Sequence, residues 1–334
     1  MTDFGLLSDE YQVCSLFVGG GTPTLVDAER IEALIGACRS IAPFEDGTEI
    51  TVEGNPGTLT PEKLAVYRRA GVNRLSLGAQ SFDDGLLKSL GRIHSAALIA
   101  EAVAMARAAG FANINLDLMY ALPGQDMGQW IETLDAAVAL NVEHISAYSL
   151  IVEPGTPMAA RVASGEAVVP DDDAVNAMQR EAIRRLAGAG YARYEISNYA
   201  KPGCECRHNL VYWNRGDYLG LGCAAYSFMG GCRFHNPQSL DAYLSGERME
   251  DVTRLTRRDV MEETLMLSTR TVQGLDLAKW ARDFGAPFAQ GREAELSRLE
   301  AGRLIEMDGG FLRLTTRGME LQNAVVLELS GENE

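Results

Sequence analysis

The polar residues best suited to binding a ligand lie at the ends of apolar runs in the first half of the chain. Residues 17–24 (FVGGGTPT) pass from an apolar run into three glycines, whose backbone N–H groups can approach a carboxylate, a phosphate or a polar nucleoside. Glu53 and Gln80 each end an apolar run, and Asp117 lies within one. A buried carboxylate or amide needs a hydrogen-bond partner. One such residue is usually structural, but three beside a glycine loop predict a pocket for a polar ligand, whose ribose hydroxyls a carboxylate can bind.

The segment 206–213 (CRHNLVYW) combines an imidazole with flat aromatic side chains. His208 can serve as an axial ligand of haem iron, and Tyr212 and Trp213 offer apolar surface to a macrocycle. A helix over this segment would place His208 and Tyr212 on one face, four residues apart. From the residues alone we favour an aromatic core cluster with a hydrogen-bonded His208, and we keep haem binding as the alternative.

The six cysteines do not have the spacing of a metal site. Cys204 and Cys206 form an isolated C-x-C pair, and no second pair lies at zinc-site spacing. Cys14 and Cys38 lie in apolar runs and are expected to be buried. In a reducing compartment most of these thiols are expected to be free.

The composition excludes several classes of partner. The 334 residues carry a formal net charge of −16, which argues against nucleic acid and anionic membranes, because phosphate contacts need clustered Lys and Arg. No run of about 18 uncharged apolar residues is present, so no membrane span is expected. The opening residues, MTDFGLLSDEYQ, lack the layout of a signal peptide, and we expect a cytoplasmic protein.

Short apolar strands alternate with amphipathic helices along the first half of the chain. Strands are predicted at 13–18, 49–52, 74–77, 114–119 and 144–150. Helices are predicted at 28–40, 61–70, 95–109 and 127–140. This repeat predicts a parallel sheet covered by helices, either as an open sheet or as a barrel. In both folds ligands bind at the carboxyl ends of the strands, where Glu53, Gln80 and Asp117 lie.

The second half of the chain has a different pattern. Predicted there are a helix at 171–190, a strand at 193–197, and loops with short strands at 201–236. Residues 255–328 form a small, mainly helical module with the pattern of a winged helix, in which Gly309 and Gly310 supply a hairpin turn. We therefore predict three segments: 1–152, 153–250 and 251–334.

Five blocks of the sequence resemble the core of one protein family: GGGTPT (19–24), EGNP (53–56), GVNRLSLGAQSF (71–82), LGRIH (90–94) and NLDLMYALPGQ (115–125). Together they look like the radical S-adenosylmethionine (SAM) core shared by oxygen-independent coproporphyrinogen III oxidases and HemW-type haem chaperones. The resemblance implies an α/β fold. This fold is a partial (β/α)6 barrel, here lacking its first strand, followed by a mainly helical C-terminal domain.

The resemblance also implies which residues contact SAM. The matching positions are Gly20, Gly21, Thr22, Glu53, Gln80, Arg92 and Asp117. The last three match a second SAM site that the oxidases can hold. Ile151 and Tyr226 align with further SAM contacts, which the family makes mainly through backbone atoms.

The segment 206–213 matches the H-N-x-x-Y-W motif of the chaperone branch of the family. The resemblance therefore moves our interpretation of His208, Tyr212 and Trp213 from a core cluster to a haem site. In that site His208 is the ligand of the haem iron.

Two departures from the family pattern bear on its chemistry. The family holds a [4Fe–4S] cluster on C-x-x-x-C-x-x-C ahead of the GGGTPT block, whereas Cys14 is the only cysteine before Gly19. Without those thiolates no radical forms from SAM, so we assign no catalytic residue and expect this chain to be non-catalytic as it stands. We expect in-frame codons for the triplet upstream of Met1. Second, Tyr226 stands where chaperone-type members often have histidine.

Three functions follow from the resemblance. We favour a HemW-type haem chaperone in porphyrin and haem metabolism, which binds haem and SAM and passes haem to an acceptor protein. The first alternative is a coproporphyrinogen III oxidase, which uses SAM for the oxidative decarboxylation of the porphyrinogen to protoporphyrinogen IX. The second is a non-catalytic, truncated homologue. The H-N-x-x-Y-W motif favours the chaperone, because the oxidase branch lacks it.

Overall fold

The computed structural model of the protein describes residues 11–331. Their contacts divide them into two units. The sheet unit comprises Tyr11–Arg193 and Ser197–Arg207, and the C-terminal unit comprises Tyr194–Ile196 and the described residues from His208 onward. The three segments predicted from the sequence divide the chain more finely than this, and that division stays a prediction.

The sheet unit is built on a sheet of seven strands in the order β1-β2-β3-β4-β5-β7-β6. Its strands are β1 (Val13–Val18), β2 (Phe44–Gly54), β3 (Arg74–Gln80), β4 (Asn113–Tyr120), β5 (His144–Ser149), β6 (Ala192–Arg193) and β7 (Asn198–Ala200). The first five strands are parallel to one another, and β7 and β6 run antiparallel at one edge. Parallel strands bring their carboxyl ends to one edge of the sheet, which gives the unit a single candidate rim for a ligand.

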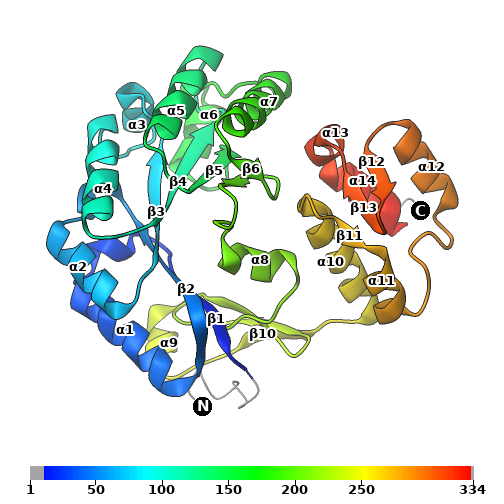
Figure 1. The fold of residues 1–334 in the computed structure, drawn as a ribbon, viewed down its shortest axis with the longest axis horizontal. Coiled ribbons are helices and arrows are strands. Elements are labelled where there is room, and N and C mark those ends of the chain that lie inside the picture. The colour runs from blue at the N-terminus through cyan, green and yellow to red at the C-terminus, as the bar shows by residue number, and fades with distance from the viewer. Residues whose placement is uncertain (1–10, 332–334) are drawn as a thin grey trace. The chain divides into compact units, whose positions relative to one another are not determined.

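Helices connect the strands and cover the outer side of the curved sheet (Figure 1). They are α1 (Ala28–Ile41), α2 (Pro61–Ala70), α3 (Asp84–Ser89), α4 (Ala96–Ala108), α5 (Met127–Ala139), α6 (Pro157–Ala163) and α7 (Asp172–Gly188). Local sequence sets their ends. Thr60 caps α2, Pro61 is its first residue, and Gly71 ends it with a positive φ of 93°. Asp126 and Gln129 form a reciprocal capping box at the start of α5.

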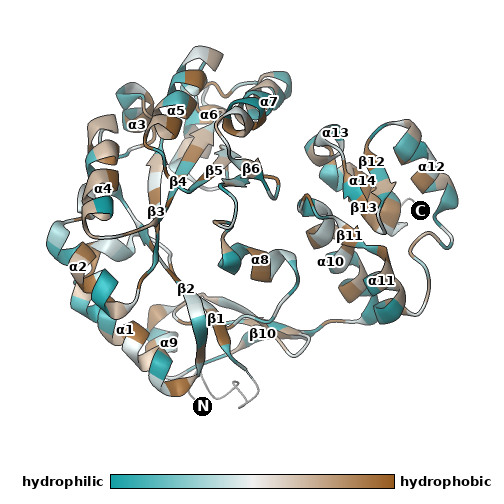
Figure 2. Cartoon of the chain, viewed as in Figure 1, coloured by the Kyte–Doolittle hydropathy of each residue, from teal (hydrophilic) through white to brown (hydrophobic). Residues whose placement is uncertain are grey.

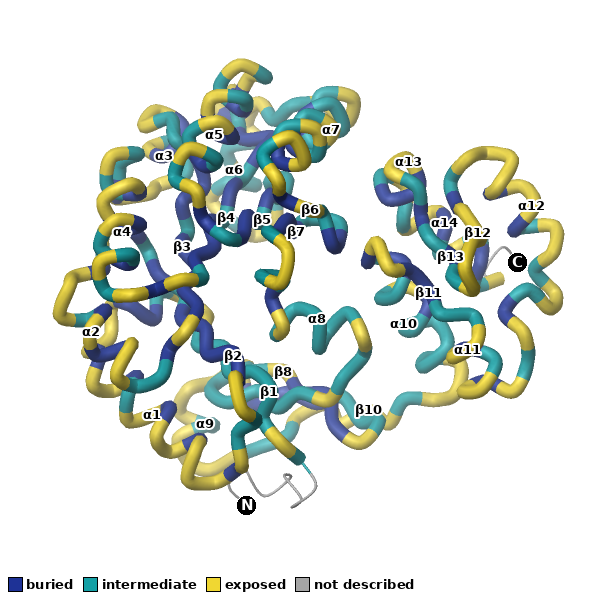
Figure 3. The backbone as a smooth tube through the Cα atoms, viewed as in Figure 1, coloured by how far each residue is buried: buried dark blue, intermediate teal, exposed yellow. Residues whose placement is uncertain are grey.

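Alternate residues of the parallel strands face two different interiors. In β4, Ile114, Leu116 and Leu118 are fully buried in the core between sheet and helices. The residues between them, Asn115 and Asp117, are polar and lie on the opposite face of the strand. The same alternation recurs in β2, β3 and β5, and most residues of β3 and β4 are buried (Figure 3). The concave side of the sheet is therefore a polar interior, in contrast to the hydrophobic residues that pack between strands and helices (Figure 2).

The five predicted strands of the parallel sheet are present, but β2 begins five residues before the predicted 49–52 and β3 continues three residues beyond the predicted 74–77. The strand predicted at 193–197 is wrong, because β6 ends at Arg193 and β7 begins at Asn198. Of the four residues between them, Tyr194–Ile196 belong to the C-terminal unit and Ser197 to the sheet unit. The aromatic and β-branched side chains of this segment are typical of strands, but packing against residues distant in the sequence determines where the segment lies. Two short helices, α3 and α6, were not predicted.

The C-terminal unit contains two small antiparallel sheets and a second hydrophobic core. Its elements are α8 (Arg207–Trp213, whose first residue belongs to the sheet unit), β8 (Tyr226–Met229), β9 (Cys232–His235), α9 (Leu240–Leu244), β10 (Glu250–Arg254), α10 (Arg257–Arg270), β11 (Leu275–Asp276), α11 (Leu277–Phe284), α12 (Glu293–Ala301), β12 (Ile305–Asp308), β13 (Phe311–Leu314), α13 (Thr316–Glu320) and α14 (Gln322–Ser330). Gly309 and Gly310 adopt positive φ at the turn between β12 and β13, as predicted. The second core packs Trp280, Phe288 and Leu312 among these helices.

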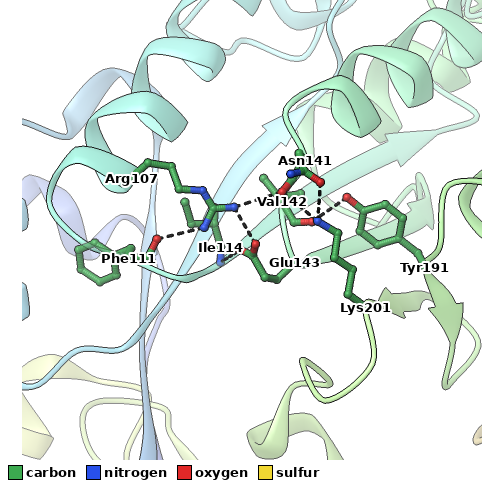
Figure 4. Close-up of polar contacts among 8 residues, drawn as sticks. All are labelled: Arg107, Phe111, Ile114, Asn141, Val142, Glu143, Tyr191 and Lys201. Atoms are coloured by element: carbon green, nitrogen blue, oxygen red, sulfur yellow. Dashed lines mark hydrogen bonds and ion pairs between the residues drawn. The ribbon is translucent and has the colours of Figure 1, made fainter.

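A polar cluster closes the amino end of the parallel strands in the sheet unit (Figure 4). The Arg107 guanidinium donates hydrogen bonds to the carbonyl oxygens of Phe111 (3.0 Å) and Asn141 (3.2 Å), and to the Glu143 carboxylate (2.8 Å). Glu143 also accepts from the Ile114 N–H at 3.1 Å. These bonds tie the end of α4 to the starts of β4 and β5.

Lys201 and Tyr191 extend this amino-end cluster (Figure 4). The Lys201 ammonium donates to the backbone and side-chain oxygens of Asn141 at 3.0 and 2.7 Å. The Tyr191 hydroxyl donates to the Val142 carbonyl at 2.7 Å. Charges and carbonyls in this cluster are therefore met by groups of the same chain.

Among the helices of residues 11–331, none is long and apolar enough to cross a membrane.

Candidate functional site

A polar cavity of about 190 Å³ lies at the carboxyl ends of the parallel strands. Its lining residues are Gly21, Thr22, Pro23, Glu53, Gly54, Asn55, Ser76, Gly78, Gln80, Arg92, Asp117 and Tyr148. Six of the residues predicted to contact SAM are in this set: Gly21, Thr22, Glu53, Gln80, Arg92 and Asp117. The volume is smaller than the roughly 300–1,000 Å³ of most small-molecule sites, so there is room for part of such a ligand only.

The glycine loop after β1 is shaped by its contact with Glu53. Gly20 and Gly21 adopt φ values of 83° and 60°, which L-residues with side chains rarely adopt. The Gly20 N–H donates to Glu53 Oε2 at 3.2 Å. At Gly19 a Cβ atom would lie 2.8 Å from the Phe17 ring and 3.0 Å from Glu53 Oε2, so a larger residue would displace these side chains. The sequence predicted that these glycines let the backbone approach a ligand closely. In the structure the group that the Gly20 N–H approaches is the Glu53 carboxylate.

Glu53 and Asp117 place two acidic groups in the same cavity. Burial raises the pKa of Glu53, and the nearby Asp117 raises it further. Burial also raises the pKa of Asp117, against hydrogen bonds from Asn115, Ser146 and Ser76 and the charge of Arg74. Two carboxyl groups whose charged forms are disfavoured gain free energy when a cation enters between them. The cavity is therefore suited to a ligand with a positive group.

Gln80 ends β3 in a strained conformation beside the cavity. Its φ is 65°, in the left-handed region that residues with side chains avoid, and a β-bulge separates it from Leu77. Its Oε1 accepts a hydrogen bond from the Tyr148 hydroxyl at 3.3 Å. A Cβ atom at Gly78 would lie 3.1 Å from Gln80 Nε2, so a glycine leaves room for the amide. Strain of this kind persists at binding sites, where surrounding contacts hold it.

Arg92 supplies the cavity with a positive group opposite in sign to its carboxylates. The residue is exposed, and its N–H donates to the Leu87 carbonyl at 2.9 Å, which anchors it to the end of α3. Carboxylates and a guanidinium around one small cavity can bind a zwitterion, with its ammonium and its carboxylate on opposite walls.

Sequence reasoning missed Tyr148, which is the residue of β5 that lines the cavity. Alternation in β5 could have found it, since His144, Ser146 and Tyr148 are the polar set of that strand. Two residues predicted to contact SAM are not among those that line the cavity. Ile151 is 72% exposed and is not a lining residue. Tyr226 belongs to the C-terminal unit, where its ring lies 4.9 Å from that of His235.

In the C-terminal unit, α8 brings His208 and Tyr212 together. Their rings meet edge to face with centroids 4.9 Å apart, and His208 Nε2 lies 3.0 Å from the Tyr212 hydroxyl. Tyr218 continues the aromatic row, with its centroid 4.6 Å from that of Tyr212. The expected helix and the shared face are therefore confirmed.

Trp213 contacts other residues of the same unit than His208 and Tyr212 do. The Arg270 guanidinium lies over its ring at 4.3 Å from the centroid. Arg270 also pairs with the fully buried Glu195, at 2.8 Å. One face of the indole is thus covered by a cation, which is a structural contact that the sequence did not reveal.

The cysteines do not form a metal centre in the part of the chain that the structure describes. Across residues 11–331, no three His, Cys, Asp or Glu side chains are grouped so that they could hold a metal ion. Cys38 is buried as predicted, whereas Cys14 is only half-buried. The buried Cys206 thiol donates to Glu49 Oε1 at 3.4 Å. The described residues therefore do not fit the [4Fe–4S] cluster that the resemblance implies.

Comparison with known proteins identifies the class. A model of the radical SAM superfamily matches residues 7–137, and a model of the HemN C-terminal domain matches residues 255–321. The structure of coproporphyrinogen III oxidase (HemN) from Escherichia coli, a radical SAM enzyme, aligns with a TM-score of 0.81 and 24% identity. That alignment covers 96% of this chain and 78% of the other. It confirms the predicted fold: a radical SAM α/β sheet with a mainly helical C-terminal region.

Curated relatives narrow the family. The haem chaperone HemW of Mycobacterium tuberculosis (strain H37Rv) is 39% identical over 328 residues, which are 97% of this chain and 82% of that protein. HemW of Bacillus subtilis is 35% identical, covering 95% of this chain and 86% of the relative. The chain belongs to the HemN/HemW family of radical SAM proteins, as the five sequence blocks indicated.

Proposed function

We propose that this protein is a haem chaperone of the HemW type, which binds haem and passes it to an acceptor protein. The observation that carries the proposal is the H-N-x-x-Y-W segment, which α8 folds so that His208 and Tyr212 lie side by side. The relatives that match nearly the whole chain carry the name haem chaperone HemW.

The haem site of this proposal is built on the aromatic row of the C-terminal unit. Haem is the cargo, and the His208 imidazole would bind its iron through Nε2. That nitrogen is now 3.0 Å from the Tyr212 hydroxyl, so binding exchanges this contact for the iron. Tyr212 and Tyr218 would pack against the macrocycle, while Trp213 keeps its contact with Arg270.

The polar cavity of the sheet unit is proposed as the site for SAM. Glu53 and Asp117 suit the positive groups of SAM and its ribose hydroxyls, and Arg92 suits its carboxylate. In radical SAM proteins a [4Fe–4S] cluster supplies the electron that cleaves SAM into a radical. Because the described residues offer no ligand set for that cluster, we derive no radical step for them.

The second candidate is an oxygen-independent coproporphyrinogen III oxidase. The likeness to HemN favours it at the level of fold, over 96% of this chain. At 24% identity this likeness supports the fold alone. A non-catalytic homologue is the third candidate. This candidate is compatible with residues 11–331, among which no ligand set for the cluster is found.

A haem titration tests the first proposal. The purified protein is expected to give a Soret band with haem, and His208→Ala is expected to weaken haem binding at least tenfold, or about 1.4 kcal/mol. His235→Gln, a histidine of the same unit outside α8, is the matched control and should bind as the parent does. Absence of the band from the parent protein, or equal affinity in His208→Ala, contradicts the proposed site.

A cleavage assay tests the oxidase candidate. The protein is reconstituted with iron and sulfide without oxygen, and SAM is added with a reductant. We expect no 5′-deoxyadenosine to form. Its formation by this chain would favour the enzyme over the chaperone.

A further inference from the structure

Beneath the proposed SAM cavity, polar side chains of β3, β4 and β5 form one connected network. Asn115 lies at its centre and is 1% exposed. His144 Nδ1 lies 2.6 Å from Asn115 Oδ1. Asn115 Nδ2 lies 2.8 Å from Asp117 Oδ1 and 2.7 Å from the Ser76 hydroxyl. Only Asp117 and Ser76 of this network line the cavity.

The chemistry of these groups fixes the direction of the hydrogen bonds. An amide oxygen only accepts, so His144 must carry its proton on Nδ1 and donate to Asn115. That bond places the Asn115 amide nitrogen on the other side, where it donates to Asp117 and to Ser76. Ser76 accepts from Asn115 and donates its own proton to Asp117 Oδ2 at 3.1 Å, because an ionised carboxylate can only accept. Asn115 and Ser76 thus both donate to the Asp117 carboxylate, whereas His144 and the Ser146 hydroxyl, at 3.3 Å, donate to Asn115 Oδ1.

The surroundings of the network both raise and lower the pKa of Asp117. Burial raises its pKa, whereas hydrogen bonds from Asn115, Ser146 and Ser76 and the charge of Arg74 lower it. The carboxylate of Glu53 faces the same cavity, as do Arg92 and the Tyr148 hydroxyl. Burial and Arg74 hold the pKa of His144 well below its usual range, so this imidazole stays neutral and keeps a single N–H.

We propose that Asn115, anchored by His144, is a positioning residue that keeps the Asp117 carboxylate ionised and turned towards the cavity. The proposal rests on the proposed function in one respect: Asp117 is taken as a contact of a positively charged ligand. It adds to that function a buried residue, outside the cavity, that sets how well the site holds a cation.

The inference predicts how the ionisation of Asp117 responds to the loss of its donors. A hydrogen bond to the charged form of a carboxyl group favours that form, and a single donor shifts the midpoint by roughly one pH unit or less. Ser76→Ala removes one donor from Asp117, and Asn115→Leu removes a second donor together with the link to His144. The midpoint should therefore rise in both variants, and further in Asn115→Leu.

Carbon-13 NMR of the Asp117 side-chain carboxyl group, followed against pH in the ligand-free protein, is the direct test. Thr51→Val is the matched control, because it removes a fully buried hydroxyl from β2 that has no hydrogen-bond partner in the structure. We expect a rise of about half to one pH unit in Ser76→Ala and no change in Thr51→Val. Equal midpoints in the parent protein and in Asn115→Leu overturn the proposal. If Asn115→Leu does not fold, Asn115→Ala takes its place, because Ser76→Ala removes only the Ser76 donor and leaves Asn115 bonded to Asp117.

Calorimetric titration with SAM at several pH values separates this inference from the proposed function. The parent protein should bind SAM more weakly at acidic pH, and in Ser76→Ala that loss should begin at a higher pH. Shifted NMR midpoints without SAM binding at any pH would support the role of Asn115 and remove SAM as the ligand. SAM binding with a pH dependence identical in all variants would support the ligand and overturn the role of Asn115.

Discussion

The two ends of the parallel sheet both carry charged side chains, but they use them differently. At the amino end, Arg107 and Glu143 bind each other and the backbone of neighbouring strands (Figure 4). At the carboxyl end, Glu53 and Asp117 share a cavity, and burial raises the pKa of both. Each group at the first end is satisfied by its own chain, whereas the second end holds charges that gain by binding a ligand.

This difference separates residues that stabilise the fold from residues that bind. In folds with parallel strands, loops at the carboxyl ends vary with function, and the opposite end serves stability. Here the distinction follows from partners and pKa shifts rather than from position alone. The same substitution, a glutamate to glutamine, can therefore be made at both ends with opposite expected results.

The largest effect is expected at the amino end, from Glu143→Gln. The ion pair with Arg107 is mostly buried, with side chains 17% and 33% exposed, and its loss leaves the guanidinium without its charge partner. We expect the free energy of unfolding to fall by about 2 kcal/mol, with SAM affinity unchanged. Urea unfolding measures this, with the exposed Glu132→Gln as the control, expected within about 0.5 kcal/mol of the parent. A matching loss in the control would mean that any glutamate of this region has the same effect.

The substitution Glu53→Gln at the carboxyl end should break the binding function and spare the fold. It removes a carboxylate whose ionisation burial disfavours, so stability should stay equal or rise by up to about 1 kcal/mol. SAM affinity should fall at least tenfold, or about 1.4 kcal/mol. Calorimetric titration and urea unfolding measure the two quantities on one sample. Lost stability with intact binding would reverse the assignment of the two ends.

The pH dependence of stability sharpens the comparison further. Glu53 and Asp117 have raised pKa values in the folded protein, so the folded state binds more protons above their ordinary pKa of about 4. Their contribution makes stability fall as the pH rises from there through the raised pKa values, by on the order of 1 kcal/mol. The double variant Glu53→Gln, Asp117→Asn should lack this fall. The measurement is the difference between parent and variant in urea midpoints from pH 4 to pH 8, and parallel curves would contradict it.

The smallest effect is expected from Tyr148→Phe in the cavity. The change removes only the hydroxyl that donates to Gln80 at 3.3 Å, a long hydrogen bond worth about 0.5 kcal/mol. SAM affinity should fall about two- to threefold, because the Gln80 amide is then free to turn. Tyr120→Phe, at a buried tyrosine that does not line the cavity, is the control for calorimetry. Equal losses in both variants would remove Tyr148 from the site.

Much of the sheet unit could be predicted, because its signals are local. Apolar runs placed the parallel strands, and Thr60, Pro61 and Gly71 marked the ends of a helix. The predictions were incomplete where contacts between residues distant in the sequence determine the structure. The segment Tyr194–Ile196 has the composition of a strand, yet it packs in the C-terminal unit. The contact of Trp213 with Arg270, a residue far along the chain, was likewise not visible in the sequence, and the haem role of Trp213 stays a prediction.

The sequence by itself determined which residues meet at the rim of the sheet. Glu53, Gln80 and Asp117 end or lie late in successive parallel strands, and such strands bring their carboxyl ends together whatever their other contacts. Only the tertiary structure decided how these groups are held. Tyr148 of β5 reaches Gln80 of β3, Ser76 of β3 reaches Asp117 of β4, and His144 of β5 reaches Asn115 beside it. Those contacts depend on strand register, which pairs residues that local sequence patterns cannot relate.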